Sequence, residues 1–166
     1  LRGWDIAATG LERAKQDPDW TVGAKIAIEG NRLYISDIVR GRWSTLKRNE
    51  IIKQVAIADK LDTTAQYIEV VALGVDVFNT VKDMLRKEGV VVRKYFPKGD
   101  KVSRASCLEP IFELGNIVLK KAEWNQAFLN EAAAFPMGRH DDQIDAVVTA
   151  AHGQLNRTRR MGLSVG

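Results

Sequence analysis

Apolar and polar residues alternate along the first third of the chain with the period of two that is typical of β-strands. This pattern predicts strands at Arg2 to Ala8, Thr21 to Ile28 and Arg32 to Val39. A polar excursion from Gly10 to Asp19 connects the first two, and the dipeptide Gly30-Asn31 predicts a turn between the second and third. Three consecutive strands with short connections indicate an antiparallel meander.

The central part of the chain alternates between helical periodicity and short apolar runs. Ser44 is a candidate N-cap for a helix that runs to about Lys60. Tyr67 to Leu73 is nearly all apolar, as in a strand covered on both faces. A second helix is expected from Asp76 to Glu88, followed by a buried strand from Val90 to Tyr95. This strand, helix and strand should form a parallel unit with a right-handed crossover.

The last third is predicted to be mainly helical. A helix from about Val102 to Leu114 should end at Gly115, and Ile117 to Leu119 forms a short extended piece. Further helices are expected from Glu123 to Ala134 and from Asp141 or Asp142 to about His152. This order of elements is that of the ribonuclease H-like architecture, an α/β fold. We therefore expect a mixed five-stranded sheet of order 3-2-1-4-5 with helices on both faces.

Composition is consistent with one soluble domain. The chain has 166 residues, of which 45% are hydrophobic and 28% charged, which is enough to form a core. No apolar run approaches the roughly 20 residues of a membrane span, and the first residues do not resemble a secretory signal. Cys107 is the only cysteine, which excludes an internal disulfide and a multi-cysteine zinc site, and we expect an unreactive buried thiol.

The formal net charge of +4 is unevenly distributed. The segment Arg86 to Arg104 contains seven basic residues and only two acids, and Val39 to Arg48 contains four basic residues and no acid. Three further arginines lie between Arg157 and Arg160. These clusters are either a solvated surface or, beside an acidic site, a surface that binds a polyanion near a metal ion.

The segment His140 to Asp145 contains three carboxylates at the start of an otherwise apolar helix. Asp142 and Asp145 are three positions apart and share one face of that helix, so both can point at one site. Carboxylate oxygens are preferred ligands of Mg²⁺ and Mn²⁺. Asp141 is expected either to cap the helix or to support the ligands without touching the ion. His140 either orients a scissile phosphate or its nucleophile, or is simply exposed at the helix start.

Two more acids lie in segments that should be buried. Asp5 lies between Trp4 and Ile6, and Glu69 follows Ile68. Each is explained by a structural salt bridge or by a bound cation. In the expected sheet order their strands are neighbours, so Asp5 and Glu69 can join the helix acids. Four such acids can hold two divalent ions roughly 3.5 to 4 Å apart, the arrangement used for in-line phosphodiester hydrolysis.

Several blocks of the sequence, in this order, resemble the C-terminal nuclease domain of phage terminase large subunits. They are Arg2 to Thr9, Asp19 to Gly23, Val39 to Ser44, Ile68-Glu69, Gly99 to Ala105, Phe135 to Gly138 and His140 to Ala146. The stretch after Glu69 departs from the glycine- and serine-rich pattern of many relatives, because this chain has Val70 to Asp76 there.

The resemblance implies a divalent-metal endonuclease that cuts concatemeric double-stranded phage DNA during genome packaging. Catalytic and metal-binding roles carry over to Asp5, Glu69, Asp142 and Asp145, although relatives differ in which helix acids touch the metal. The implied cofactors are Mg²⁺ or Mn²⁺, with two ions. The residues expected to contact DNA are Arg40, Arg42, Lys98, Lys101, Arg104 and His140. The Lys101 to Arg104 block would contact phosphate or position the active-site loop.

Terminase large subunits also carry an N-terminal ATPase, but no G-x-x-x-x-G-K-[ST] motif occurs here. Residues 1–166 are therefore expected to be a single nuclease domain. In the full-length protein its partners would be the ATPase domain, the small terminase subunit and the portal. The expected location is the cytoplasm of an infected bacterial host, or of a lysogen.

Two other interpretations remain open. The chain could be another ribonuclease H-like nuclease, such as a junction resolvase, with the same acid site but a different DNA substrate. It could also be a non-catalytic DNA-binding module, in which the acids only form salt bridges to Arg40, Arg42 or Arg104.

Overall fold

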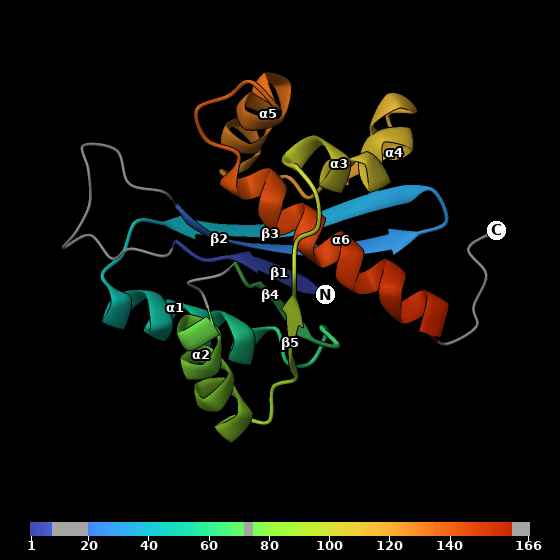
Figure 1. The fold of residues 1–166 in the computed structure, drawn as a ribbon. Helices are drawn as coiled ribbons and strands as arrows, with labels where there is room; N and C mark the ends of the chain where they lie inside the picture. The colour runs from blue at the N-terminus through green and yellow to red at the C-terminus, as the bar shows by residue number, and fades with distance from the viewer. Residues whose placement is uncertain (8–19, 72–74, 161–166) are drawn as a thin grey trace.

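A six-stranded mixed sheet forms the centre of the computed structural model (Figure 1), which describes residues 1–7, 20–71 and 75–160. The order across the sheet is β5-β4-β1-β2-β3-β6. In chain order the strands are β1 (Arg2–Asp5), β2 (Thr21–Glu29), β3 (Arg32–Gly41), β4 (Gln66–Glu69), β5 (Val92–Tyr95) and β6 (Ile117–Leu119). The first three strands pair antiparallel, whereas β4 is parallel to both β1 and β5.

The predicted order 3-2-1-4-5 is confirmed, but the predicted number of strands is wrong by one. The short segment β6 pairs parallel to β3, with Ile117 opposite Leu33. Three residues are too few to show a periodicity, so the sequence indicated only an extended piece. Three strands are also shorter than predicted, since β1 ends at Asp5, β4 ends at Glu69 and β5 begins only at Val92. The expected excursion at residues 10–19, and residues 8, 72 and 73 of the predicted strands, lie outside the described residues.

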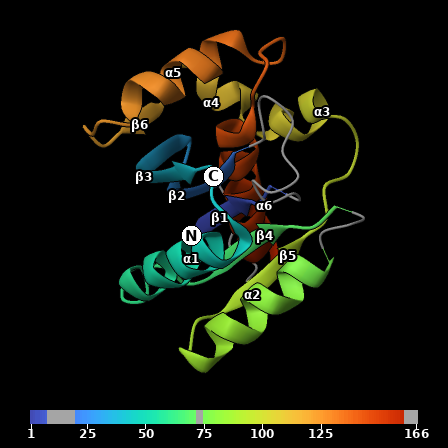
Figure 2. The same cartoon turned by 90° about the vertical axis from the view of Figure 1, so that its left-hand side faces the viewer.

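Helices cover both faces of the sheet, as predicted (Figures 1 and 2). They are α1 (Thr45–Ala58), α2 (Val75–Lys87), α3 (Lys101–Ala105), α4 (Glu109–Glu113), α5 (Asn125–Ala134) and α6 (Asp142–Arg160). On one face α1 and α2 bury Trp4 and Ile68 of the sheet together with Phe78. On the other face α6 crosses the sheet, and its apolar residues pack with those of β2 and β3. None of the described helices is both long and apolar enough to cross a membrane.

The predicted helix from Val102 to Leu114 is in fact interrupted. It forms α3, a 3₁₀ turn at Ser106–Leu108 and then α4. Pro110 explains the break, because proline lacks an amide hydrogen and its ring clashes with the carbonyl four residues before it. Lys101 and Arg104 therefore lie on a separate short helix.

Helix α6 approaches the sheet very closely at Gly3. A Cβ atom at Gly3 would lie 2.3 Å from the carbonyl oxygen of Ala146 and 2.5 Å from the amide nitrogen of Ala150. The backbone of α6 thus lies directly on that of β1. This contact places the first turns of α6 above the end of β1.

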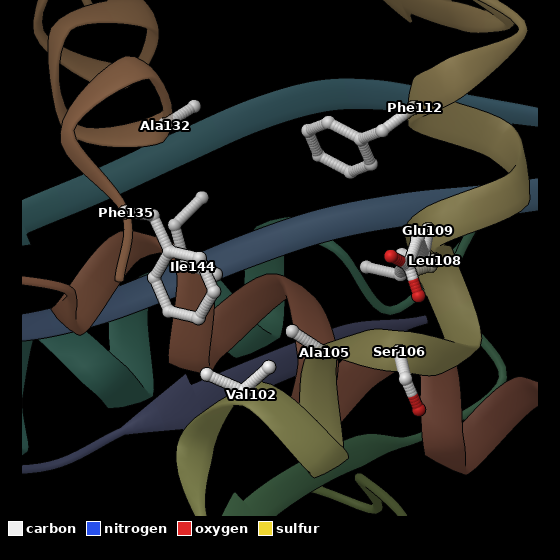
Figure 3. Close-up of a pocket in the computed structure, with 9 residues that line it drawn as sticks. All are labelled: Val102, Ala105, Ser106, Leu108, Glu109, Phe112, Ala132, Phe135 and Ile144. Carbon is white, nitrogen blue, oxygen red and sulfur yellow. The ribbon is translucent and has the colours of Figure 1, made fainter. Parts of the chain in front are cut away.

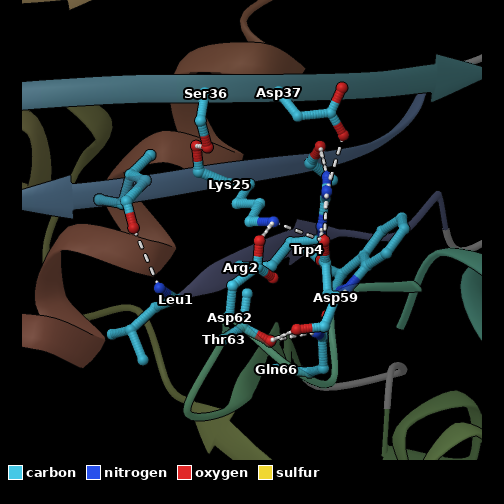
Figure 4. Close-up of polar contacts among 12 residues, drawn as sticks. Leu1, Arg2, Trp4, Lys25, Ser36, Asp37, Asp59, Asp62, Thr63 and Gln66 are labelled. Carbon is cyan, nitrogen blue, oxygen red and sulfur yellow. Dashed lines mark hydrogen bonds and ion pairs between the residues drawn. The ribbon is translucent and has the colours of Figure 1, made fainter. Parts of the chain in front are cut away.

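A buried ionic network holds the beginning of β1 (Figure 4). Arg2 is only 1% exposed, and its guanidinium donates to Asp59, Asp37 and the carbonyl oxygen of Gly23 over 2.6 to 2.8 Å. Lys25 also pairs with Asp59, at 3.0 Å. Because each buried charge has a partner, the network links β1 to β2, β3 and the turn after α1 without leaving an uncompensated ion.

We predict that Gly3→Ala lowers the free energy of unfolding by about 1 to 3 kcal/mol, because the added methyl group must push α6 away from β1. Chemical denaturation measures this change. Ala27→Val is the matched control, since it also adds side-chain volume to the sheet but at an exposed position of β2. Equal stability of the Gly3→Ala variant and the wild type would contradict the close contact.

Candidate active site

Two carboxylates lie side by side at one end of the sheet. Asp5 is the last residue of β1, and Glu69 is the last residue of β4. The two strands run parallel, and Trp4 lies opposite Ile68. Asp5 and Glu69, the next residue in each strand, are therefore neighbours. The predicted juxtaposition of Asp5 and Glu69 is therefore present.

Helix α6 brings two further carboxylates to the same end of the sheet. Asp142 and Asp145 lie in its first turn, and each is only 8% exposed. One turn further along, the hydroxyl of Thr149 donates to Oε2 of Glu69 over 3.1 Å. Helix α6 is therefore linked directly to the acid of β4. Thr149 was not predicted, although it continues the face defined by Asp142 and Asp145.

The amide groups at the start of α6 are capped by a residue from another helix. The carboxylate of Glu131, in α5, accepts hydrogen bonds from the backbone of Gln143 and Ile144 and from the Gln143 side chain. Asp141, which was expected either to cap the helix or to support the ligands, accepts hydrogen bonds from Lys101 through its carboxylate. Nothing in the sequence pairs Glu131 with this helix, since the contact depends on how α5 packs.

Two cations from α3 contact the acid cluster. Nη1 of Arg104 lies 2.8 Å from Oε1 of Glu69, and Nη2 lies 3.5 Å from Oδ1 of Asp145. Nζ of Lys101 pairs with Asp141 and lies 3.7 Å from Oδ2 of Asp145. Within residues 1–7, 20–71 and 75–160, no basic side chain forms an ion pair with Asp5.

Burial and neighbouring charges raise the pKa of two of these acids, Asp5 and Asp145. Burial, and then the charges of Glu69, Asp142 and Asp145, raise the pKa of Asp5 well above its usual range. Burial also raises the pKa of Asp145 to about 6; Glu69 and Asp141 add to the rise, while Arg104 and Lys101 oppose it. The shifts show that the four predicted acids share one electrostatic environment.

The chemistry of this donor set fits a hard divalent cation, because such ions prefer carboxylate oxygens and offset the repulsion between them. Asp5, Glu69, Asp142 and Asp145 are the residues that could hold it. In the arrangement shown, no three acidic, histidine or cysteine side chains of the described residues form a group that could hold a metal ion. Arg104 and Lys101 instead form ion pairs with acids of this cluster.

The backbone at the end of α3 is held by α6. Nε2 of His152 lies 3.1 Å from the carbonyl oxygen of Arg104, and the Cys107 thiol also donates to this oxygen. The His152 ring stacks on Tyr95 with a centroid distance of 5.1 Å. Cys107 is partly rather than fully buried, and burial raises the pKa of its thiol, which favours the unreactive form that we expected.

The residues predicted to contact DNA lie on both sides of the acids. Arg40 and Arg42, at the end of β3, both stack over the ring of Trp20, at 4.6 and 4.4 Å from its centroid. Nε2 of His140 lies 3.5 Å from Arg42, and its Nδ1 lies 3.5 Å from Asp142. On the other side, Lys98 is exposed between β5 and α3. Trp20 was part of the family resemblance, but no role was predicted for it.

Some of the acids form the salt bridges that the non-catalytic alternative predicts. Arg104 pairs with Glu69 and Asp145, as that alternative requires. Arg40 and Arg42 are stacked on Trp20. A purely structural set of ion pairs does not explain why Asp5 lies among three other acids at the end of a central strand.

The sheet order, with helices on both faces, defines a ribonuclease H-like fold. The family described as the terminase RNaseH-like domain matches residues 2–153, and the chain belongs to this family. Among curated protein sequences, none matches the chain significantly.

Two solved structures have a similar fold. The human cytomegalovirus terminase nuclease domain, from a manganese-soaked and inhibitor-bound structure, is similar with a TM-score of 0.64 and 15% identity, over 91% of this chain and 80% of that chain. The large terminase of a thermophilic bacteriophage is similar with a TM-score of 0.58 and 13% identity. That match covers 93% of this chain but only 39% of the phage protein.

The raised pKa of Asp145 predicts a pH dependence of stability without metal. An acid whose pKa is higher in the folded state stabilises the fold when protonated, so this contribution is present below its ordinary pKa of 3.8 and is lost as the pH rises through about 6. Between pH 4 and 6.5 the wild type should lose about 2 kcal/mol more stability than Asp145→Asn. Chemical denaturation at each pH measures the difference.

The control for this experiment is Asp83→Asn, which removes an exposed carboxylate of α2. It should follow the wild type across the whole pH range. If the stability of Asp145→Asn has the same pH dependence as that of the wild type, the pKa of Asp145 is not raised in the folded protein.

Proposed function

We propose that this chain is a divalent-metal-dependent endonuclease that cleaves concatemeric double-stranded DNA during viral genome packaging. The observation that carries the proposal is the convergence of Asp5, Glu69, Asp142 and Asp145 in a chain of the terminase RNaseH-like family. Carboxylates that repel one another in a largely buried site lower the stability of a protein. Their presence together therefore favours a function that requires them.

In this proposal the four acids hold Mg²⁺ or Mn²⁺, with two ions when DNA is bound. The cytomegalovirus terminase nuclease domain was soaked with manganese, which supports a divalent metal in this fold family. Bound ions would supply an activated water and neutralise the charge that develops on the phosphodiester. Thr149 keeps the Glu69 carboxylate in position, and Glu131 keeps the first turn of α6 in place.

The surrounding basic residues support a path for DNA across the acids. β1 lies in the middle of the sheet, with Arg40 and Arg42 toward the β3 side and Lys98 toward the β5 side. Stacking on Trp20 orients two guanidinium groups before any ligand arrives, which suits them to bind phosphate oxygens. Contacts of this kind position a duplex without selecting its base sequence.

The chain matches only 39% of the length of the phage large terminase, so most of that protein has no counterpart here. We propose that the domain works with an ATPase domain, a small terminase subunit and a portal. The proposed setting is the cytoplasm of an infected bacterial host or of a lysogen.

Asp5→Asn tests the proposed catalysis, because it keeps the size of the side chain but removes its charge. We expect Mn²⁺-dependent nicking of supercoiled plasmid to fall by at least about a hundredfold, since a lost metal contact is worth several kcal/mol. DNA affinity, measured by fluorescence anisotropy, should be retained. Asp83→Asn, in α2, should cleave as the wild type does.

Substrate preference separates this proposal from a junction resolvase. Cleavage of linear duplex at a rate comparable with four-way junctions supports the terminase function. Strict dependence on a junction, or nicking that is unaffected by Asp5→Asn, would contradict it.

A further inference from the structure

The two cations of α3 occupy the carboxylate oxygens that the proposed function assigns to metal ions. Both oxygens of Glu69 accept protein hydrogen bonds, one from Arg104 and the other from Thr149. Both oxygens of Asp145 face a cation, with Arg104 on one side and Lys101 on the other. A divalent ion that binds these oxygens competes with the guanidinium group, because the two positive charges repel each other within a buried space.

We propose that Arg104 is an internal counter-ion that stabilises the metal-free acid cluster and leaves Glu69 and Asp145 when a divalent cation binds. This inference rests on the proposed function, since it concerns the same carboxylates. Lys101 assists by pairing with Asp141 and Asp145, but its half-exposed side chain contributes less than the buried Arg104.

The position of Arg104 is well suited to such an exchange. It is 8% exposed, so its charge strongly offsets the repulsion among the acids. Its Nε is buried and has no hydrogen-bond acceptor within the described part of the chain, so the guanidinium is not fully satisfied there. Its backbone carbonyl is held near His152 and Cys107. The side chain can therefore leave while the end of α3 stays attached to α6.

The apolar side of α3 faces a cavity that opens to solvent. Val102 and Ala105 line an open cavity of about 230 Å³, together with Phe112, Phe135 and Ile144 (Figure 3). The cavity opens to solvent and Val102 is exposed, so other parts of the chain do not enclose α3 on this side. The beginning of this five-residue helix can then adjust while the carbonyl group of Arg104 stays next to His152 of α6.

Once Arg104 has left the acids, its guanidinium remains next to the site, where the proposed function places the scissile phosphate. A guanidinium matches the geometry of phosphate oxygens and can bind two of them at once. The same residue would thus neutralise carboxylates in the metal-free protein and phosphate in the complex with DNA.

Isothermal titration of Mn²⁺ into the metal-free protein, without DNA, tests the exchange. Arg104→Gln removes the competing charge, so we expect Mn²⁺ affinity to rise by at least about tenfold, the equivalent of one lost charge-assisted hydrogen bond. Arg86→Gln, an exposed position of α2 away from the acids, controls for the loss of one positive charge and should change affinity little. Unchanged or weaker binding by Arg104→Gln would show that Arg104 supports the ligands rather than competing with the ion.

Thermal unfolding provides a second readout. Without metal, Arg104→Gln should lower Tm by roughly 5 °C or more, because Glu69 and Asp145 lose their partner. Saturating Mn²⁺ should restore most of this loss. If Mn²⁺ does not restore it, Arg104 has a purely structural role and the inference is wrong.

Hydrogen exchange of the wild type does not depend on the variant folding. Addition of Mg²⁺ should increase amide exchange in α3 while it decreases exchange in the first turn of α6, and a decrease in both would contradict the release of Arg104. If neither the wild type nor Arg104→Gln binds any divalent cation, the proposed function itself fails. Equal binding by the two proteins would overturn only the inference about Arg104.

Discussion

Mutual repulsion among four carboxylates, two of them buried and two partly buried, is the constraint on which the rest of this structure depends. Asp5 and Glu69 are held together by the parallel pairing of β1 and β4, and α6 brings Asp142 and Asp145 against them. The acids cannot separate, because α6 lies directly on the backbone of β1 at Gly3. Arg104 lies among these acids and offsets part of the repulsion, while burial and the neighbouring charges raise the pKa of Asp5. A divalent cation could take over the role of Arg104.

The basic residues around the acids then have two distinct roles. Arg104 and Lys101 contact the carboxylates, whereas Arg40 and Arg42 stack on Trp20 at the end of β3. Other arginines in the same sequence clusters are structural. Arg48, for example, is buried and donates to the carbonyl oxygen of Ala7. Net charge alone would not have separated these roles, because burial and partners decide which cations remain available for DNA.

Sequence patterns predicted the sheet order and the four acids because both depend on periodicity and on charges in apolar segments. Asp5 and Glu69 were recognisable as acids in buried strands, and Asp142 and Asp145 by their helical spacing. The pattern could not show that β6 pairs with β3, or that Glu131 caps α6, because both follow from the packing of distant segments. It also missed that Pro110 divides one expected helix into α3 and α4, which leaves Arg104 on a short separate helix.

We propose that Asp5, Glu69, Asp142 and Asp145 form one divalent-metal site at the end of the sheet. Crystals of the protein soaked with Mn²⁺ test it most directly, because the anomalous signal of manganese locates the ion without reference to activity. We predict anomalous density between β1, β4 and the first turn of α6, with carboxylate oxygens within about 2.0 to 2.6 Å, as for hard cations in general. Saturating Mn²⁺ that leaves this space empty, with Arg104 still bound to Glu69, would contradict the account.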